Sequence, residues 1–172
     1  MKTFKKNMKP NGSLLKNTND HHAPLKVLES LNHPLIPKLI SYDNESYECE
    51  FIKGENLFDY IQRTRNVEWG ITLVKTVNEF LYSLLNLKNI DSKPQLFADD
   101  ISGVNIMVTK EGRPYIVDLD QFGFFETQAV FNIFKETNIR LYDAILLSLL
   151  NGTVNKQNIR IKNLENKILG LM

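Results

Sequence analysis

The sequence has little cysteine, almost no net charge and no long apolar run, and each absence excludes a class of protein. Its single cysteine, Cys49, can form neither an intramolecular disulfide nor a cysteine zinc cluster, which favours a reducing compartment. The 21 Lys and Arg residues nearly balance 20 Asp and Glu residues, so a nucleic-acid partner is not expected. The longest apolar stretch, Ala144–Leu150, is interrupted by Ser148 and is too short to span a bilayer.

The N-terminus is basic, but it lacks the apolar segment that a signal peptide has. Lys2, Lys5, Lys6 and Lys9 are followed by the polar turn residues Pro10–Gly12. We therefore expect a cytoplasmic protein. The lysines are interpreted as part of a solvent-exposed strand or chain end rather than as a phosphate-contacting arm.

The first half of the chain alternates between strand-like and helical segments. Strands are predicted over Lys2–Met8 and Ser46–Ile52, the second followed by a turn at Lys53–Asn56. Apolar residues at helical spacing predict a helix over Leu25–Leu31 and a long helix over Trp69–Leu87.

The second half predicts a hairpin between helices. Its strands are Asn105–Thr109 and Pro114–Asp118, and a later helix over Arg140–Leu150 is ended by Asn151–Gly152. Apolar residues from Ile159 to Leu171 predict a last amphipathic helix. This order, in a chain of 172 residues, indicates a single domain of the α+β class.

Three polar residues at the ends of the predicted hairpin stand out. Asp100 and Asn105 enclose the segment Asp-Ile-Ser-Gly-Val-Asn, and Asp118 ends an apolar strand. Each residue alone is more often part of a turn, because Asp and Asn favour turns. Together they offer the carboxylate and amide oxygens that Mg²⁺ prefers, beside a carboxylate able to orient a hydroxyl group for phosphoryl transfer.

This segment resembles the catalytic and metal-binding loops of the protein-kinase superfamily, where an aspartate precedes a metal-binding asparagine with four residues between them. The resemblance implies that Asp100 is the catalytic or substrate-orienting carboxylate and that Asn105 and Asp118 bind magnesium. Asp120 is included as a further candidate metal ligand.

A second stretch, from Tyr47 to Phe58, resembles the hinge of a kinase and the helix that follows it. The resemblance implies that backbone groups of Glu50, Phe51 and Ile52 hold the adenine ring of ATP. Cys49 then limits the back of the pocket, and Met107 lines it. We expect Asn105 and Asp118 to converge on one cleft that faces these residues.

The departures from the family pattern favour an atypical member. Ala98-Asp99-Asp100 replaces His-Arg-Asp, Ser102 replaces a lysine, and Asp118-Leu119-Asp120 replaces Asp-Phe-Gly. The catalytic loop is thereby closer to small-molecule kinases and to lipopolysaccharide sugar kinases. No Ala-Pro-Glu segment is found, which leaves the acceptor, a protein or a small molecule, open.

The front of the expected fold is reduced. No Gly-rich phosphate loop precedes the first strand, and Lys16, on a predicted second strand, is the candidate phosphate-binding lysine. Glu29 is the candidate partner of that lysine. An absent first strand would leave a sheet edge that a second subunit can cover.

The resemblance thus implies a truncated protein-kinase-like fold with a small N-terminal lobe over residues 1–52 and a helix-rich C-terminal lobe over residues 53–172. The expected function is phosphate transfer from ATP, with Mg²⁺, to a hydroxyl group. Two alternatives stay open at this point: a pseudokinase that binds without catalysis, and an unrelated α+β interaction domain.

Overall fold

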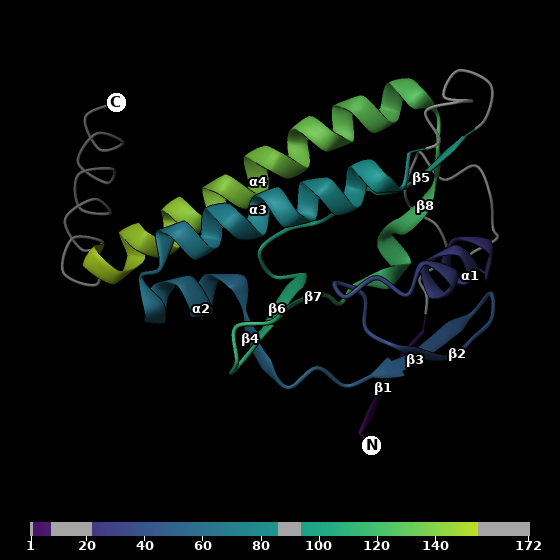
Figure 1. Cartoon of the computed structure of the whole chain (residues 1–172), viewed down its shortest axis with the longest axis horizontal. Coiled ribbons are helices and arrows are strands. Elements are labelled where there is room, and N and C mark those ends of the chain that lie inside the picture. The colour runs from purple at the N-terminus through teal and green to yellow at the C-terminus, as the bar shows by residue number, and fades with distance from the viewer. Residues whose placement is uncertain (1, 8–21, 86–93, 155–172) are drawn as a thin grey trace, which may run out of the picture.

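The chain folds as a mixture of helices and short antiparallel strands, and the predicted α+β class is confirmed (Figure 1). The structure, a computed structural model, describes residues 2–7, 22–85 and 94–154. The predicted strand that carries Lys16 and the predicted helix over 159–171 lie outside these residues.

A three-stranded antiparallel sheet forms one region of the molecule. It contains β1 (Thr3–Asn7), β2 (Leu39–Tyr42) and β3 (Ser46–Glu50) in the order β1-β3-β2. The β2–β3 turn is fixed by the Asp43 carboxylate, which accepts hydrogen bonds from two backbone amides of the turn at 2.7 Å. The strand predicted to reach Ile52 ends at Glu50.

Helix α1 (His22–Leu31) packs beside this sheet. Pro24 lies in its first turn, where the missing N–H costs little, and Leu25 and Leu28 are buried. Asn32, with a φ of 45°, ends the helix, as predicted from the Asn-His-Pro sequence. The His33 ring then stacks on Phe80 at 4.4 Å between centroids, which joins this turn to the helical region.

A second antiparallel sheet contains the predicted hairpin, β6 (Ile106–Thr109) and β7 (Pro114–Ile116), and a third strand, β4 (Gly54–Asn56). The prediction of a turn at 53–56 was wrong, because the last three of these four residues pair with β6. Gly54 lies so close to β6 that an added Cβ would stand 2.3 Å from the Val108 carbonyl oxygen. Only glycine fits there.

Helices α2 (Leu57–Thr64), α3 (Val67–Ser83) and α4 (Thr127–Val154) form the larger region, with α3 and α4 running side by side (Figure 1). The prediction for α4 was too short at both ends. The helix begins at Thr127 rather than Arg140, and it continues through Asn151–Gly152, where a stop was expected.

A two-stranded antiparallel sheet, β5 (Gln95–Ala98) with β8 (Phe122–Phe125), lies close to α1 and α4. The sequence did not reveal β8. Between β7 and β8 the chain makes one 3-10 turn, η2 (Leu119–Gln121), directly after Asp118.

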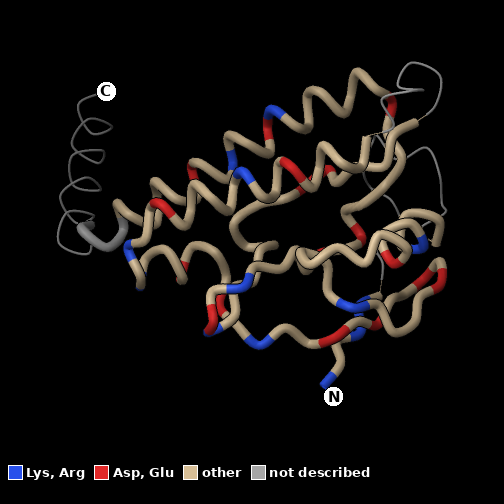
Figure 2. The backbone as a smooth tube through the Cα atoms, in the orientation of Figure 1, with Lys and Arg blue, Asp and Glu red and all other residues tan. Residues whose placement is uncertain are grey.

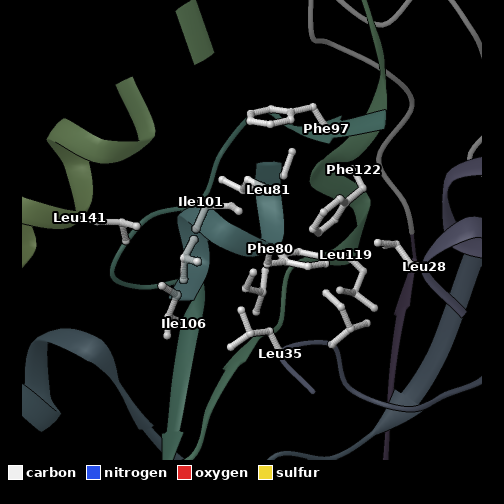
Figure 3. Packing of buried hydrophobic residues seen from close by; sticks show 14 of the residues in the cluster. Leu28, Leu35, Phe80, Leu81, Phe97, Ile101, Ile106, Leu119, Phe122 and Leu141 are labelled. Carbon is white, nitrogen blue, oxygen red and sulfur yellow. The ribbon is translucent and has the colours of Figure 1, made fainter. Parts of the chain in front are cut away.

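The hydrophobic core joins these elements into one body (Figure 3). Phe80 of α3 and Phe122 of β8 meet edge to face at 6.2 Å, and Leu119 of η2 is fully buried. Burying side chains of this size contributes roughly 1.5–3 kcal/mol each. The loops around Asp100 and Asp118 are anchored here through Ile101 and Leu119.

Charged residues of both signs are spread over the molecule. Figure 2 shows acidic and basic residues interspersed along the backbone, in keeping with a net charge of +1. Within the described ranges, none of the helices is long and apolar enough to cross a membrane.

Candidate functional site

Asn105 and Asp118 lie together at one end of the β6–β7 hairpin. The strand register pairs Ile106 with Ile116, and the Val117 amide donates to the Asn105 carbonyl at 3.0 Å. The residue after Val117 is therefore held next to Asn105. Two residues that are 13 positions apart in the sequence come together because the hairpin turn is short.

These two residues face a cavity of about 390 Å³. Its wall brings together β1, the segment after β3, and the end of the hairpin. Of the residues predicted from the sequence, it contains Cys49, Glu50, Phe51, Ile52, Asn105, Met107 and Asp118. The expected convergence of Asn105 and Asp118 on one cleft facing residues 49–52 is therefore observed.

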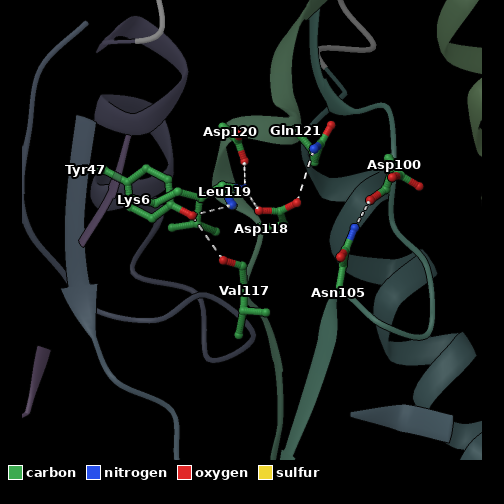
Figure 4. Close-up of polar contacts among 9 residues, drawn as sticks. All are labelled: Lys6, Tyr47, Asp100, Asn105, Val117, Asp118, Leu119, Asp120 and Gln121. Carbon is green, nitrogen blue, oxygen red and sulfur yellow. Dashed lines mark hydrogen bonds and ion pairs between the residues drawn. The ribbon is translucent and has the colours of Figure 1, made fainter. Parts of the chain in front are cut away.

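The cavity wall also contains Lys6, which was interpreted from the sequence as solvent-exposed. Strand β1 pairs Lys6 directly with Tyr47, so both side chains lie on the same face of the sheet. The Lys6 ammonium forms ion pairs with Asp118 and, at 2.8 Å, with Asp120 (Figure 4). Its side chain is only 24% exposed. The signal in the sequence was alternation, which puts Lys6 on the same face as Phe4.

The electrostatics of this cluster favour the charged forms. Partial burial alone would lower the pKa of Lys6, but hydrogen bonds from its ammonium to Asp118 and Asp120 outweigh burial and raise it above the usual value. Burial would likewise raise the pKa of Asp118, yet hydrogen bonds from Lys6 and from Gln121, the latter at 3.2 Å, lower it. Lys6 and Asp118 therefore stay ionised across the neutral range.

Tyr47 fixes the backbone on both sides of Asp118. Its hydroxyl donates to the Val117 carbonyl at 3.2 Å and accepts from the Leu119 amide at 3.3 Å (Figure 4). The Tyr47 side chain is buried, which raises its pKa and keeps the phenol neutral. The sheet that carries Lys6 is thus bound to the loop that carries Asp118. Sequence reasoning assigned no role to Tyr47.

Asp100 lies on the other side of Asn105 and does not line the 390 Å³ cavity. The Asn105 amide nitrogen donates to the Asp100 backbone carbonyl at 2.9 Å, which leaves the amide oxygen on the opposite side (Figure 4). The Asp100 carboxylate accepts from Arg140 of α4 at 2.9 Å, and its side chain is 47% exposed. Nothing in the sequence indicated that α4 would bring Arg140 there.

Asp100 instead lines a second, more open cavity of about 460 Å³, together with Glu136 and Arg140. The loop between Asp100 and Asn105 borders both cavities, because Asp100 lines one and Asn105 lines the other. Gly103 of this loop packs against α2 and α4 so closely that an added Cβ would lie 2.6 Å from Phe58 and 2.9 Å from Ala144. The Gly103 carbonyl also accepts from the Leu57 amide at the start of α2, at 3.1 Å.

The segment interpreted as a hinge is only partly free to bind a ligand. The Glu50 amide donates to the Lys38 carbonyl at 2.9 Å, and the Phe51 amide donates to the Lys2 carbonyl at 3.0 Å. These two amides are therefore not available to an adenine ring. The amide of Ile52 makes no hydrogen bond to another described residue, and it lies at the cavity wall.

Cys49 is a buried residue of the cavity wall. It is buried, and burial raises the pKa of its thiol to about 11, so the residue is a neutral core group rather than a nucleophile. Met107 and Phe4 add apolar surface to the wall. A flat, apolar ligand group fits such a wall better than a charged one.

The predicted helix partner of the phosphate-binding lysine does not reach the cavity. Glu29 of α1 accepts a hydrogen bond from the Tyr42 hydroxyl at 2.7 Å, on an exposed surface. Among the described residues, Lys6 is instead held by the two aspartates of the loop after β7.

The donor set suits a hard cation that retains water or phosphate oxygens. The described part of the chain contains no group of three acidic, His or Cys residues placed to chelate a metal ion. The Asp118 carboxylate and the Asn105 amide oxygen, both at the cavity wall, nevertheless match the one or two protein ligands that Mg²⁺ takes beside a bound phosphate. Asp120 does not line the cavity.

Comparison with known proteins found no match that could assign a role to this site. No protein-family model matches the sequence, and no curated protein matches it.

Proposed function

We propose that this chain binds ATP and magnesium in the 390 Å³ cavity and transfers the terminal phosphate to a hydroxyl group of a protein or small molecule. One observation carries the proposal. A single cavity wall combines an apolar part, the partly buried ammonium of Lys6, and the oxygen donors Asn105 and Asp118. Adenine needs an apolar surface, the phosphates need a cation, and magnesium needs oxygen donors.

The arrangement of elements agrees with a reduced kinase-like fold. In that family the phosphate-binding lysine lies on a strand that precedes a helix, and the asparagine and metal aspartate follow much later in the chain. Here Lys6 lies on β1, ahead of α1, and Asn105 and Asp118 flank the β6–β7 hairpin. We accordingly assign the phosphate-binding role to Lys6 rather than Lys16, with residues 1–52 as the small lobe and 53–172 as the larger one.

Each residue has a distinct task in the proposed reaction. Lys6 binds the phosphates, and the Ile52 amide and the apolar wall hold the base. Asp100, in the neighbouring cavity, orients the acceptor hydroxyl and receives its proton while the hydroxyl oxygen bonds to phosphorus and ADP leaves. Asn105 and Asp118 would hold magnesium, which would neutralise negative charge at the phosphates.

A pseudokinase is the second candidate, and one observation favours it. Lys6 forms an ion pair with the Asp118 carboxylate, the proposed metal ligand. The carboxylate of α1, that of Glu29, binds Tyr42 and does not pair with Lys6. Such a site would bind nucleotide without transferring phosphate.

The test is transfer of labelled terminal phosphate from ATP to a panel of protein and small-molecule acceptors, combined with a thermal shift on adding ATP and Mg²⁺. We expect Asp118→Asn to lose the magnesium-dependent thermal shift and transfer, and Asp100→Ala to lose transfer but keep the thermal shift. Equal label with all three proteins would exclude the assigned site. A thermal shift without transfer by the wild type would favour the pseudokinase.

A further inference from the structure

The two aspartates that contact Lys6 occupy different positions. Asp118 lines the cavity and its side chain is 23% exposed, whereas Asp120 does not line it and its side chain is 8% exposed. Both carboxylates reach the same ammonium because Asp118 directly precedes the 3-10 turn η2 and Asp120 lies within it, one on each side of Leu119 in the sequence (Figure 4). Leu119 is fully buried, so the turn is anchored in the core.

A lysine that binds phosphates needs a carboxylate to hold it in place, and in protein kinases a helix glutamate has that task. Helix α1 contains one acidic residue, Glu29. That carboxylate accepts from Tyr42 on the exposed surface and makes no contact with Lys6. The carboxylate that holds the lysine must therefore come from another element.

We propose that Asp120 is the positioning residue that holds Lys6 at the cavity, in place of a helix glutamate, and that Asp118 is thereby left to the metal ion. The inference rests on the proposed function for its phosphate role. It replaces the sequence-based prediction that Asp120 is a metal ligand.

The division of tasks follows from position and charge. Lys6, Asp118 and Asp120 together carry one net negative charge, so one carboxylate can turn to a cation while the ammonium keeps the other. Only Asp118 has access to the cavity. Asp120, buried and 2.8 Å from Lys6, can hold the ammonium without meeting a ligand. A charge-assisted hydrogen bond of this length orients the side chain strongly.

The first experiment needs no nucleotide. A double-mutant cycle of Lys6→Met and Asp120→Asn, followed by urea unfolding, measures the coupling between the two side chains. We expect a clear coupling for this pair and none for a matched cycle of Lys6→Met with Glu29→Gln. An absent Lys6–Asp120 coupling, or a larger coupling to Glu29, would overturn the proposal.

The second experiment separates lysine positioning from metal binding. ATP affinity is measured by calorimetry with EDTA and then with Mg²⁺, for wild type, Asp120→Asn, Asp120→Glu and Asp118→Asn. We expect Asp120→Asn to lower the metal-free affinity about tenfold and to keep the ratio of affinities with and without Mg²⁺. Asp118→Asn should lose that ratio, and Asp120→Glu, which keeps a carboxylate, should recover part of the metal-free affinity.

The outcomes distinguish this inference from the function on which it rests. Wild type that binds no ATP, although Lys6 and Asp120 are coupled, would refute the proposed function and the phosphate role of Lys6. If Asp120→Asn binds ATP normally with EDTA but its affinity no longer rises with Mg²⁺, Asp120 is a metal ligand and the proposal is overturned. The exposed Asp143→Asn variant serves as a control for a general loss of negative charge.

Discussion

Two ion pairs lie on opposite sides of Asn105, and they differ in how far water reaches them. Lys6 and Asp118 are 24% and 23% exposed, whereas Arg140 and Asp100 are 41% and 47% exposed. Tyr47 fixes the backbone on both sides of Asp118, and a second carboxylate, that of Asp120, contacts Lys6. The second pair joins Arg140 of α4 to Asp100 with both side chains more exposed. The side that would hold nucleotide is therefore preorganised, while the side that would meet an acceptor can rearrange at little cost.

The largest difference is expected when each cation is removed in turn. Lys6→Met leaves two neighbouring carboxylates without their cation, and we expect the free energy of unfolding to fall by about 2 kcal/mol, less than for a fully buried pair. Arg140→Met is the matched control and should cost no more than about 0.5–1 kcal/mol, because its pair is exposed. Urea unfolding measures both. Equal losses would remove the distinction between the two sides.

The next effect concerns the tyrosine on the nucleotide side. Tyr47→Phe removes the hydroxyl between the Val117 carbonyl and the Leu119 amide and should cost about 1–2 kcal/mol. It should also weaken ATP binding, since the Asp118 loop loses its link to the sheet. Tyr82→Phe, at an exposed position, is the control. A normal ATP affinity for Tyr47→Phe would show that the link does not position the loop.

A smaller effect is expected from acid. The folded-state pKa of Asp118 is lowered, so its contribution to stability is fully present above the ordinary aspartate pKa and is lost as pH falls through the folded value. Thermal unfolding between neutral pH and about pH 3 should show this loss in the wild type. Asp118→Asn should show a shallower decline over the same range. An unchanged slope would mean that other carboxylates account for the acid sensitivity.

The smallest expected effect is the slow alkylation of Cys49, which measures how well this part of the cavity wall excludes solvent. Burial raises the pKa of its thiol to about 11, so at pH 8 the folded protein holds it as the unreactive thiol. Alkylation by iodoacetamide should be slow in the folded state and rapid in denaturant, as measured by mass spectrometry. Alkylation of the folded protein at the rate of a free thiol would show that the back of the cavity is open.

The hairpin and the residues at its ends were predictable because their signals are local. Asn105 and Asp118 flank two short apolar strands with turn residues between them, and strand pairing then forces the ends together. The α+β class follows from the order of such segments. The segment from Cys49 to Ile52 was placed at the same cleft by resemblance, and only its hydrogen bonding differed.

Lys6 was missed because alternation places it on the face of Phe4 but does not say which face of the strand meets the rest of the molecule. Its role depends on register: pairing with Tyr47 directs it toward a loop 112 residues later, and a shift by one residue would direct it to solvent. Lys16, which falls outside the described residues, was preferred for its place in a predicted strand.

The missed elements have the same cause. Strand β4 is three residues long and exists because β6 pairs with it, so its sequence alone indicates a turn. Helix α4 passes through Asn151–Gly152, since tertiary packing and length outweigh weak stop signals. Arg140 reaches Asp100 only because α4 begins at Thr127 and passes the loop.

Strand β1, which carries Lys6, is one of the two outer strands of the three-stranded sheet in the described part of the chain. Its five residues are held by β3 on one side, so local opening of this strand would require far less free energy than unfolding of the core. Such an opening would carry the ammonium out of the cavity while α3 and α4 remain folded. Amide hydrogen exchange in β1 should accordingly be faster than in β3 and should slow when nucleotide binds. Nucleotide binding and the opening of this short strand are then thermodynamically coupled.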